Sequence, residues 1–187
     1  MDGSGSVVER DQLRALLLER SVRFGEFILA SGKRSSYYID ARLTTMSGKG
    51  QALIGRVGLR LLDDLRWQPE ALGGLTLGAD PIAYAIAHAA TLDGRTLDAF
   101  TVRKEAKAHG AGRLVEGGFQ PGMPVVIVED VITTGESALR AVQAIREGGG
   151  RILGVLALVD REEGGRERIE QEGLAVAAMF RASELRA

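Results

Sequence analysis

The amino-acid sequence predicts an α/β fold in which helices flank a central parallel sheet. Short apolar runs of strand length alternate with longer segments whose apolar residues recur at helical spacing. One run, residues 125–128, is continuously apolar and β-branched, which is typical of a strand buried on both faces of a parallel sheet. The length of 187 residues, without an internal repeat or an interdomain linker, predicts a single domain over residues 1–187.

The amino-terminal part of the chain does not follow this alternation. Residues 8–20 place leucines on one side of a helix, and residues 27–29 and 37–39 predict a hairpin around a Ser-Gly-Lys-Arg-Ser turn. A second helix is expected at residues 51–65, started by Ser47 or Gly48. We expect the first helix and the hairpin to form a small cap over the carboxyl edge of the sheet.

From residue 71 onward, strands and helices alternate regularly. The expected elements are a strand at 71–77, a helix at 81–92, a strand at 97–102, a polar loop at 104–118, a strand at 125–128, a helix at 137–147, a strand at 152–159, a charged helix around 163–171 and a strand at 174–179. This order predicts a doubly wound parallel sheet, because each crossover helix packs on one face of the sheet.

Composition excludes several classes of protein. The chain is 45% apolar and 26% charged with a formal charge of −1, so no overall field favours nucleic acid or an anionic membrane. No apolar run has the length of a membrane span, and residues 1–6 lack the apolar core of a secretory signal, so we expect a cytoplasmic protein. The absence of cysteine excludes disulfides and thiol chemistry. We expect His88, in an apolar helix, to be a packing residue.

Residues 125–137 run from the buried strand into two adjacent acids and then into a loop of small residues. Ligands of open α/β sheets bind at the carboxyl ends of strands, where Glu129 and Asp130 can accept hydrogen bonds from a vicinal diol such as that of ribose. Hydroxyls, free backbone N–H groups and the dipole of the next helix favour a phosphate in the loop. Singly, such residues are ordinary helix caps, but together they predict a ribose-phosphate site. The loop consists of Val131, Ile132, Thr133, Thr134, Gly135, Glu136 and Ser137.

The charged segment at 104–118 is either a functional loop or a solvated surface loop. Lys104 and Lys107 are two of only four lysines in the chain, Arg103 precedes them and His109 follows. A compact ammonium group suits a phosphate as a point charge. Because a phosphate motif lies downstream, we favour a mobile basic loop that faces a diphosphate.

Three motifs together resemble the orotate phosphoribosyltransferases, a family of type I phosphoribosyltransferases. Residues 125–137 resemble the signature for 5-phosphoribosyl 1-diphosphate, residues 101–112 resemble the catalytic loop, and residues 24–40 resemble the amino-terminal hood that binds the base. The resemblance extends over nearly the whole chain from about residue 10. It implies the type I phosphoribosyltransferase fold, with hood elements at about 10–45, an α/β core at about 70–180 and a mobile catalytic loop at 103–118.

The resemblance also implies a reaction. A pentosyltransferase of this family, a glycosyltransferase of the de novo pyrimidine and UMP biosynthesis pathway, moves phosphoribose from 5-phosphoribosyl 1-diphosphate to orotate, giving orotidine 5′-monophosphate and diphosphate. The expected cofactor is Mg²⁺, held mainly by the diphosphate and ribose, with Asp80 and Asp130 as candidate carboxylates. The family forms homodimers with shared active sites, because the loop reaches into the neighbouring subunit. Neither a nucleic acid nor a membrane is expected as a partner.

The expected roles of the basic loop follow from charge. As the ribose C1–O bond breaks, negative charge grows on the departing diphosphate, and Arg103, Lys104 and Lys107 would stabilise it. His109 would donate to a diphosphate oxygen or protonate it on departure. We therefore name Lys107, His109 and Arg103 as the candidate catalytic residues.

Orotate needs a stacking face and a cation for its carboxylate. The positions that match family contacts are Tyr37 and Tyr38 for the ring, Arg161 for the carboxylate and Thr133. For the two tyrosines the alternative is a strand pair with one ring buried and one exposed.

Two departures from the family pattern could mark a subfamily or shift base preference. Ala30 stands where many members carry a lysine, and Leu77-Gly78 replaces a Tyr-Lys pair. A purine-type phosphoribosyltransferase would share the donor motif and the fold, and a regulator that keeps the fold as a ligand sensor would need a basic surface for nucleic acid.

Overall fold

The computed structural model describes residues 3–28, 32, 34–105 and 114–186, with side chains from residue 7 onward. Its centre is a six-stranded sheet in the order β5-β4-β3-β6-β7-β8, parallel except for β5 at one edge. The chain passes from β3 outward to β4 and then returns to the other side of β3, so the strand order reverses between β3 and β6. In doubly wound sheets this point is where ligands bind. The strands are β3 (Ala71–Leu75), β4 (Asp98–Val102), β5 (Val115–Gly117), β6 (Pro124–Ile132), β7 (Arg151–Asp160) and β8 (Val176–Arg181).

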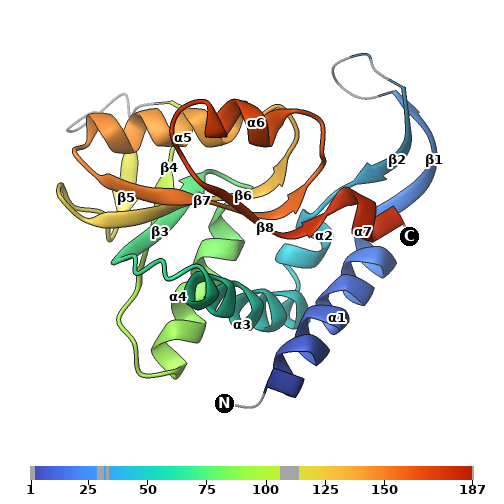
Figure 1. Cartoon of the computed structure of the whole chain (residues 1–187), viewed down its shortest axis with the longest axis horizontal. Helices are drawn as coiled ribbons and strands as arrows, with labels where there is room; N and C mark the ends of the chain where they lie inside the picture. The colour runs from blue at the N-terminus through green and yellow to red at the C-terminus, as the bar shows by residue number, and fades with distance from the viewer. Residues whose placement is uncertain (1–2, 29–31, 33, 106–113, 187) are drawn as a thin grey trace.

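Helices cover both faces of this sheet, as the alternating pattern predicts (Figure 1). One face carries α3 (Gly48–Asp64) and α4 (Asp80–Leu92), and the other carries α5 (Glu136–Glu147) and α6 (Gly165–Glu170). The continuous apolar run of β6 follows from its position, because its side chains are buried on both faces of the sheet. Val126 and Val128 join the core beneath α3 and α4, whereas Val125 and Ile127 join the core beneath α5. Successive side chains of a strand point to opposite faces, so a fully buried strand has no polar position.

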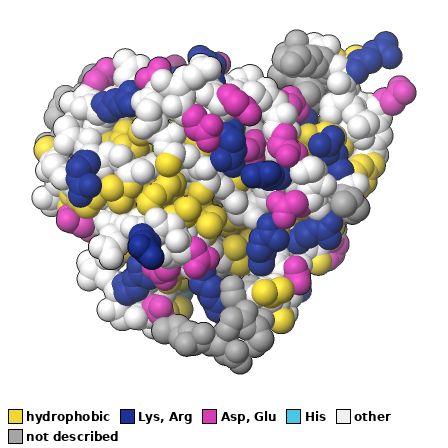
Figure 2. All heavy atoms as spheres, viewed as in Figure 1, with side chains coloured by type: hydrophobic (Ala, Val, Ile, Leu, Met, Phe, Trp, Pro, Cys, Tyr) yellow, Lys and Arg dark blue, Asp and Glu magenta, His cyan; other side chains and the backbone are white. Residues whose placement is uncertain are grey.

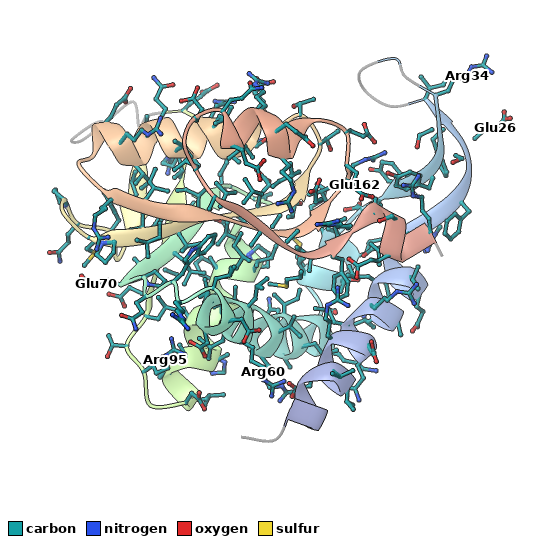
Figure 3. All side chains as sticks on the ribbon, in the orientation of Figure 1. Glu26, Arg34, Arg60, Glu70, Arg95 and Glu162 are labelled. Carbon is teal, nitrogen blue, oxygen red and sulfur yellow. The ribbon has the colours of Figure 1, made fainter. Side chains whose placement is uncertain are left out.

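The amino-terminal elements lie at one end of the sheet (Figure 1). Helix α1 (Gly3–Arg20) packs against α3, and β1 (Val22–Ile28) pairs with β2 (Arg34–Ile39) as a separate antiparallel hairpin. The predicted helix and hairpin are confirmed, with longer strands than the apolar pattern indicated. At the tip of the hairpin, the side chains of Glu26 and Arg34 point away from the body (Figure 3).

Short elements complete the chain. Helix α2 (Arg42–Thr45) follows the hairpin, and α7 (Ala182–Arg186) follows β8. Helix α3 begins at Gly48 because Ser47 is its N-cap, with the hydroxyl accepting a hydrogen bond from Gly50 N at 3.1 Å. No helix of the described residues is both long and apolar enough to cross a membrane.

Two local expectations change. Strand β5 lies within the segment expected to be a loop, because its pairing with β4 supplies hydrogen bonds that its sequence does not signal. His88 is exposed rather than packed, since the buried stripe of α4 runs through Ile82, Ile86 and Ala90 and leaves His88 outside it.

Candidate active site

A cavity of about 750 Å³ lies at the carboxyl ends of β3 and β6, where the strand order reverses. Its walls come from residues 38–42 after the hairpin, residues 75–78 after β3, the end of β6 with its following loop, and the residues after β7. Segments far apart in the sequence therefore meet at this edge of the sheet. The predicted site residues that line it are Tyr38, Lys104, Glu129, Asp130, Val131, Thr133, Thr134, Ser137 and Arg161.

The two adjacent acids of β6 lie in different environments. Glu129 is 6% exposed, and its Oε2 atom is buried without a hydrogen-bond partner among the described residues. Asp130 is half-buried and accepts a hydrogen bond from Val131 N through Oδ1 at 2.8 Å. Burial, and then the charge of Asp130, raise the pKa of Glu129 to about 9. Glu129 therefore holds a proton at neutral pH, while Asp130 lines the cavity beside it.

Gly78 makes room for Asp130. A Cβ atom at residue 78 would lie 2.7 Å from Cγ and from both carboxylate oxygens of Asp130. Such an approach is far inside ordinary van der Waals contact, so the carboxylate can occupy this place only because residue 78 is glycine. The contact gives a physical reason for a glycine at residue 78, which is one half of the Leu77-Gly78 departure.

The loop after β6 forms a second cavity of about 110 Å³, lined by Glu129 and residues 131–137. Gly135 has a left-handed φ of 76° directly before α5. A Cβ atom at Gly165 would lie 2.5 Å from Thr133 O, so the loop rests closely on the start of α6. The cavity is large enough for one phosphate group, and the hydroxyls of Thr133, Thr134 and Ser137 lie in its lining.

The two tyrosines separate, with one ring in the cavity and one in the core. Tyr38 is 41% exposed and lines the cavity, whereas Tyr37 is 5% exposed and is not among the lining residues. Neighbouring side chains of a strand face opposite sides, so only one of the pair can meet a ligand. Of the two tyrosines expected to cover the base, only Tyr38 lines the cavity, and its contact with a base stays a prediction.

Arg161 is 6% exposed, unusually buried for an arginine, and it lines the cavity. Its Nε donates to Glu163 Oε1 at 2.8 Å, and its backbone N–H donates to Ile132 O at 2.9 Å. Nη2 lies 2.8 Å from the same Glu163 oxygen but makes no hydrogen bond within the described part of the chain. A buried guanidinium with unused donors at a cavity wall is suited to a ligand carboxylate.

The remaining predicted residues fall into two groups. Lys104 lines the cavity, and its backbone oxygen accepts a hydrogen bond from Arg140 Nη2 at 3.0 Å, while Arg103 lies 3.8 Å from Glu116. Lys107 and His109 lie outside the described residues.

Asp80 is occupied by neighbouring hydroxyls. Its Oδ2 accepts from Thr76 Oγ1 at 2.6 Å, and its Oδ1 accepts from Thr101 Oγ1 at 2.9 Å. Asp80 is not among the residues that line the cavity, so Asp130 is the better placed of the two carboxylates for a bound metal. Within the described residues no group of three or more Asp, Glu or His side chains could hold a metal by itself.

Sequence reasoning missed one pair of residues in the cavity wall. Arg42 Nε donates to Asp40 Oδ1 at 2.9 Å, and both residues line the cavity. A hydrogen bond to Asp40 and its charge raise the pKa of Arg42. The sequence did contain a signal for this pair, because Asp40 and Arg42 come directly after the strand predicted at residues 37–39.

Comparison with known proteins identifies the family. An orotate phosphoribosyltransferase of Aquifex aeolicus (strain VF5) is 48% identical over 182 residues, covering 96% of this chain and 98% of that protein. The chain belongs to the orotate phosphoribosyltransferase family. An orotate phosphoribosyltransferase of Mycobacterium avium (strain 104) is 47% identical over 95% of this chain and 96% of its own length. No protein-family model matches the chain.

Solved structures of the family share this fold. A crystal structure of Mycobacterium tuberculosis H37Rv orotate phosphoribosyltransferase with Fe(III) dicitrate has a TM-score of 0.84 and 46% identity, covering 95% of this chain and 98% of that one. The same enzyme in complex with 5-phospho-alpha-D-ribosyl 1-diphosphate has a TM-score of 0.78 and 40% identity, covering 95% and 91%. The predicted type I phosphoribosyltransferase fold is confirmed. An adenine phosphoribosyltransferase from Leishmania donovani, at 14% identity and a TM-score of 0.63, shares the fold alone.

Proposed function

We propose that this protein is an orotate phosphoribosyltransferase that moves phosphoribose from 5-phosphoribosyl 1-diphosphate to N1 of orotate, releasing diphosphate. The carrying observation is one cavity that joins an acid pair and a phosphate loop to an exposed ring, Tyr38, and a buried cation, Arg161. These are the groups that a sugar phosphate and a flat anionic base require. The close relatives bear the same activity in their names.

The donor would bind along the end of β6. Its 5-phosphate fits the small cavity at Thr133, Thr134 and Ser137, and its ribose hydroxyls would meet the acid pair. Protonated Glu129 can donate to one hydroxyl while Asp130 accepts from the other. With these two hydrogen bonds, Glu129 can bind the ribose without losing its proton.

The base would bind opposite the hairpin. The ring of Tyr38 offers a stacking face, and Arg161 offers unused donors to the orotate carboxylate. Thr133 lies in the lining of both cavities, so its hydroxyl can reach either substrate. Holding both substrates at one sheet edge would bring the base nitrogen to ribose C1.

Charge separation at ribose C1 has to be stabilised as diphosphate leaves. Lys104 lies in the cavity wall, and we extend this role to Arg103, Lys107 and His109 as the basic loop. Asp130, a carboxylate that lines the cavity, fits Mg²⁺ and would be the protein group that holds it beside the donor. When bound, the ion supplies charge neutralisation of the departing diphosphate.

Three further parts of the proposal concern the setting of the reaction. The protein would act in the cytoplasm, in the pathway that makes UMP, and as a homodimer in which the loop of one subunit serves the site of the other. Support for a dimer comes from exposed apolar side chains beside the cavity and on α4, Leu77 and Tyr84. Figure 2 shows acidic and basic side chains interspersed over the face in view, which does not favour a nucleic-acid-binding regulator.

The deciding experiment measures loss of orotate absorbance with 5-phosphoribosyl 1-diphosphate and Mg²⁺, with adenine, guanine, xanthine and uracil run in parallel. We expect consumption of orotate that depends on both donor and metal. Transfer to a purine alone would overturn the assignment of the base site.

A variant then tests the loop. Lys107→Ala should lower turnover at least about a hundredfold with an unchanged melting temperature. Near-normal turnover would remove Lys107 from the mechanism. Lys49→Ala, which removes an exposed lysine from the start of α3, is the matched control.

A further inference from the structure

The buried tyrosine of the hairpin and the last helix of the chain converge on Arg161. We propose that Tyr37 and α7 position Arg161 for the carboxylate of the base, and so set the preference for a carboxylate-bearing pyrimidine over one that lacks it. This inference rests on the proposed function, in which Arg161 binds that carboxylate. Tyr37 and α7 are positioning elements, because neither lines the cavity.

The ring of Tyr37 packs against two guanidinium groups. The central carbon of Arg161 lies 4.7 Å from the ring centroid, and that of Arg186, in α7, lies 5.0 Å from it. A cation over an aromatic face is attracted by the ring, and a buried flat ring restricts the plane that the guanidinium can adopt.

Among the described residues the charged partner of the Arg161 side chain is Glu163, and Nε and Nη2 both lie 2.8 Å from the same carboxylate oxygen. Its side-chain hydrogen bond goes from Nε to a single oxygen of Glu163, and Nη2 has no hydrogen-bond partner among the described residues. Contacts to a single oxygen restrain the guanidinium plane less than a two-oxygen pair would, whereas a bidentate contact to a ligand carboxylate needs a defined plane. The packing on Tyr37 supplies the missing restraint.

The loop that carries Arg161 is itself attached to α7. The next residue, Glu162, has a left-handed φ of 59°, and its carboxylate accepts hydrogen bonds from Ser183 N at 2.8 Å and Ser183 Oγ at 3.1 Å. Figure 3 labels Glu162 in this loop, close to α7. Arg186 Nη2 also lies 3.8 Å from Glu162. Helix α7 is therefore connected to Arg161 twice, through the Glu162 carboxylate and through the Tyr37 ring.

The helix can act as a fixed support because α1 holds its other side. Arg10 is paired with the Glu184 carboxylate, and Arg14 Nε donates to Glu184 O at 2.7 Å. A continuous series of contacts thus runs from α1 through α7 to Arg161. A change in α7 should reach the base site without touching the phosphate loop.

The test compares Tyr37→Leu with Tyr37→Phe in binding titrations of orotate, uracil and 5-phosphoribosyl 1-diphosphate. Loss of the ring should weaken orotate binding at least about tenfold, change donor and uracil binding by less than about twofold, and leave kcat less affected than KM for orotate. The phenylalanine variant keeps the ring face and should bind all three ligands as the wild type does. Equal weakening of all three ligands by Tyr37→Leu would mean general structural damage and would overturn the proposal.

Two further variants separate the parts of the argument. Arg186→Gln should weaken orotate binding selectively, whereas Arg151→Gln, which removes an exposed arginine at the start of β7, should not. In an Arg161→Gln background, Tyr37→Leu should have no added effect on orotate, because the two act as one unit. A wild-type protein that fails to bind orotate would refute the proposed function, whereas a wild type that binds orotate with unaltered Tyr37 and Arg186 variants would refute this inference alone.

Discussion

Replacing Gly78 by alanine tests whether the position of Asp130 is essential. The added Cβ would lie 2.7 Å from Cγ and both oxygens of that carboxylate, about 0.7 Å short of the 3.4 Å at which ordinary contact begins. Because all three atoms are equally close, turning the carboxylate about its own axis relieves nothing. The carboxylate has to swing away about the Cα–Cβ bond of Asp130, and its hydrogen bond from Val131 N would be strained or lost.

A displacement of this size has a predictable cost. Misplacing a reacting or binding group by about 1 Å can lower a rate about a hundredfold, so we expect kcat/KM for 5-phosphoribosyl 1-diphosphate to fall about 10- to 100-fold in Gly78→Ala. The fold should persist, because Gly78 has no left-handed φ and its side chain would meet only Asp130 among its nearest contacts. The assay is steady-state kinetics with varied donor at saturating orotate, together with a melting curve.

The matched control is Gly48→Ala. Gly48 is the first residue of α3, and a Cβ there meets nothing within 4 Å. This variant should keep wild-type kinetics. If Gly78→Ala also kept kcat/KM within about twofold of the wild type, the close approach of residue 78 to Asp130 would have no functional meaning.

Two predictions concern stability. The folded protein keeps a proton on Glu129 up to about pH 9, while the unfolded chain releases it near 4.5, so the wild type loses stability as pH rises through this window. The difference in free energy of unfolding between Glu129→Gln and the wild type should therefore grow with pH, by at most about 1.4 kcal/mol per pH unit. Urea unfolding between pH 5 and 9 measures this difference. A difference that does not change with pH would contradict the prediction. Ser47→Ala removes the N-cap of α3 and should lower the free energy of unfolding by about 1 kcal/mol, with Ser36→Ala on the exposed side of β2 as control, and equal stability of the two variants would count against the cap.

Local patterns in the sequence were sufficient to predict the main layers of the fold. The apolar run of β6, the alternation after residue 71 and the turn residues of the hairpin each report the immediate environment of the backbone. The sequence did not predict strand β5, because its three residues, Val115–Gly117, gain their conformation from pairing with β4. Helix α7 was not predicted for a similar reason, since its contacts are with Glu162 and with α1, which are distant from it in the sequence.

The site was predictable where it follows one stretch of chain and unpredictable where distant stretches meet. The acids and the loop of residues 129–137 are contiguous, so the sequence alone could predict that they lie together at one cavity. That Tyr37 and Tyr38 face opposite ways follows from strand geometry, but which one faces the ligand depends on where the hairpin sits on the sheet. The contact between Gly78 and Asp130 exists only because β3 and β6 are neighbours.

The charges of the cavity bear on why the proposed reaction would need a mobile basic loop and a metal ion. Among the described lining residues the acids outnumber the cations, and two of the cations already have acidic partners. The acids are Asp40, Glu129, Asp130 and Glu163, and the cations are Arg42, Lys104 and Arg161. With a proton on Glu129, the three charged acids balance the three cations, so the wall suits a ribose and a base but has no net positive charge to attract a free diphosphate. Mg²⁺ together with the proposed loop cations would supply the positive charge that the diphosphate requires. In that arrangement part of the positive charge would arrive with the substrate, as the metal ion that it carries.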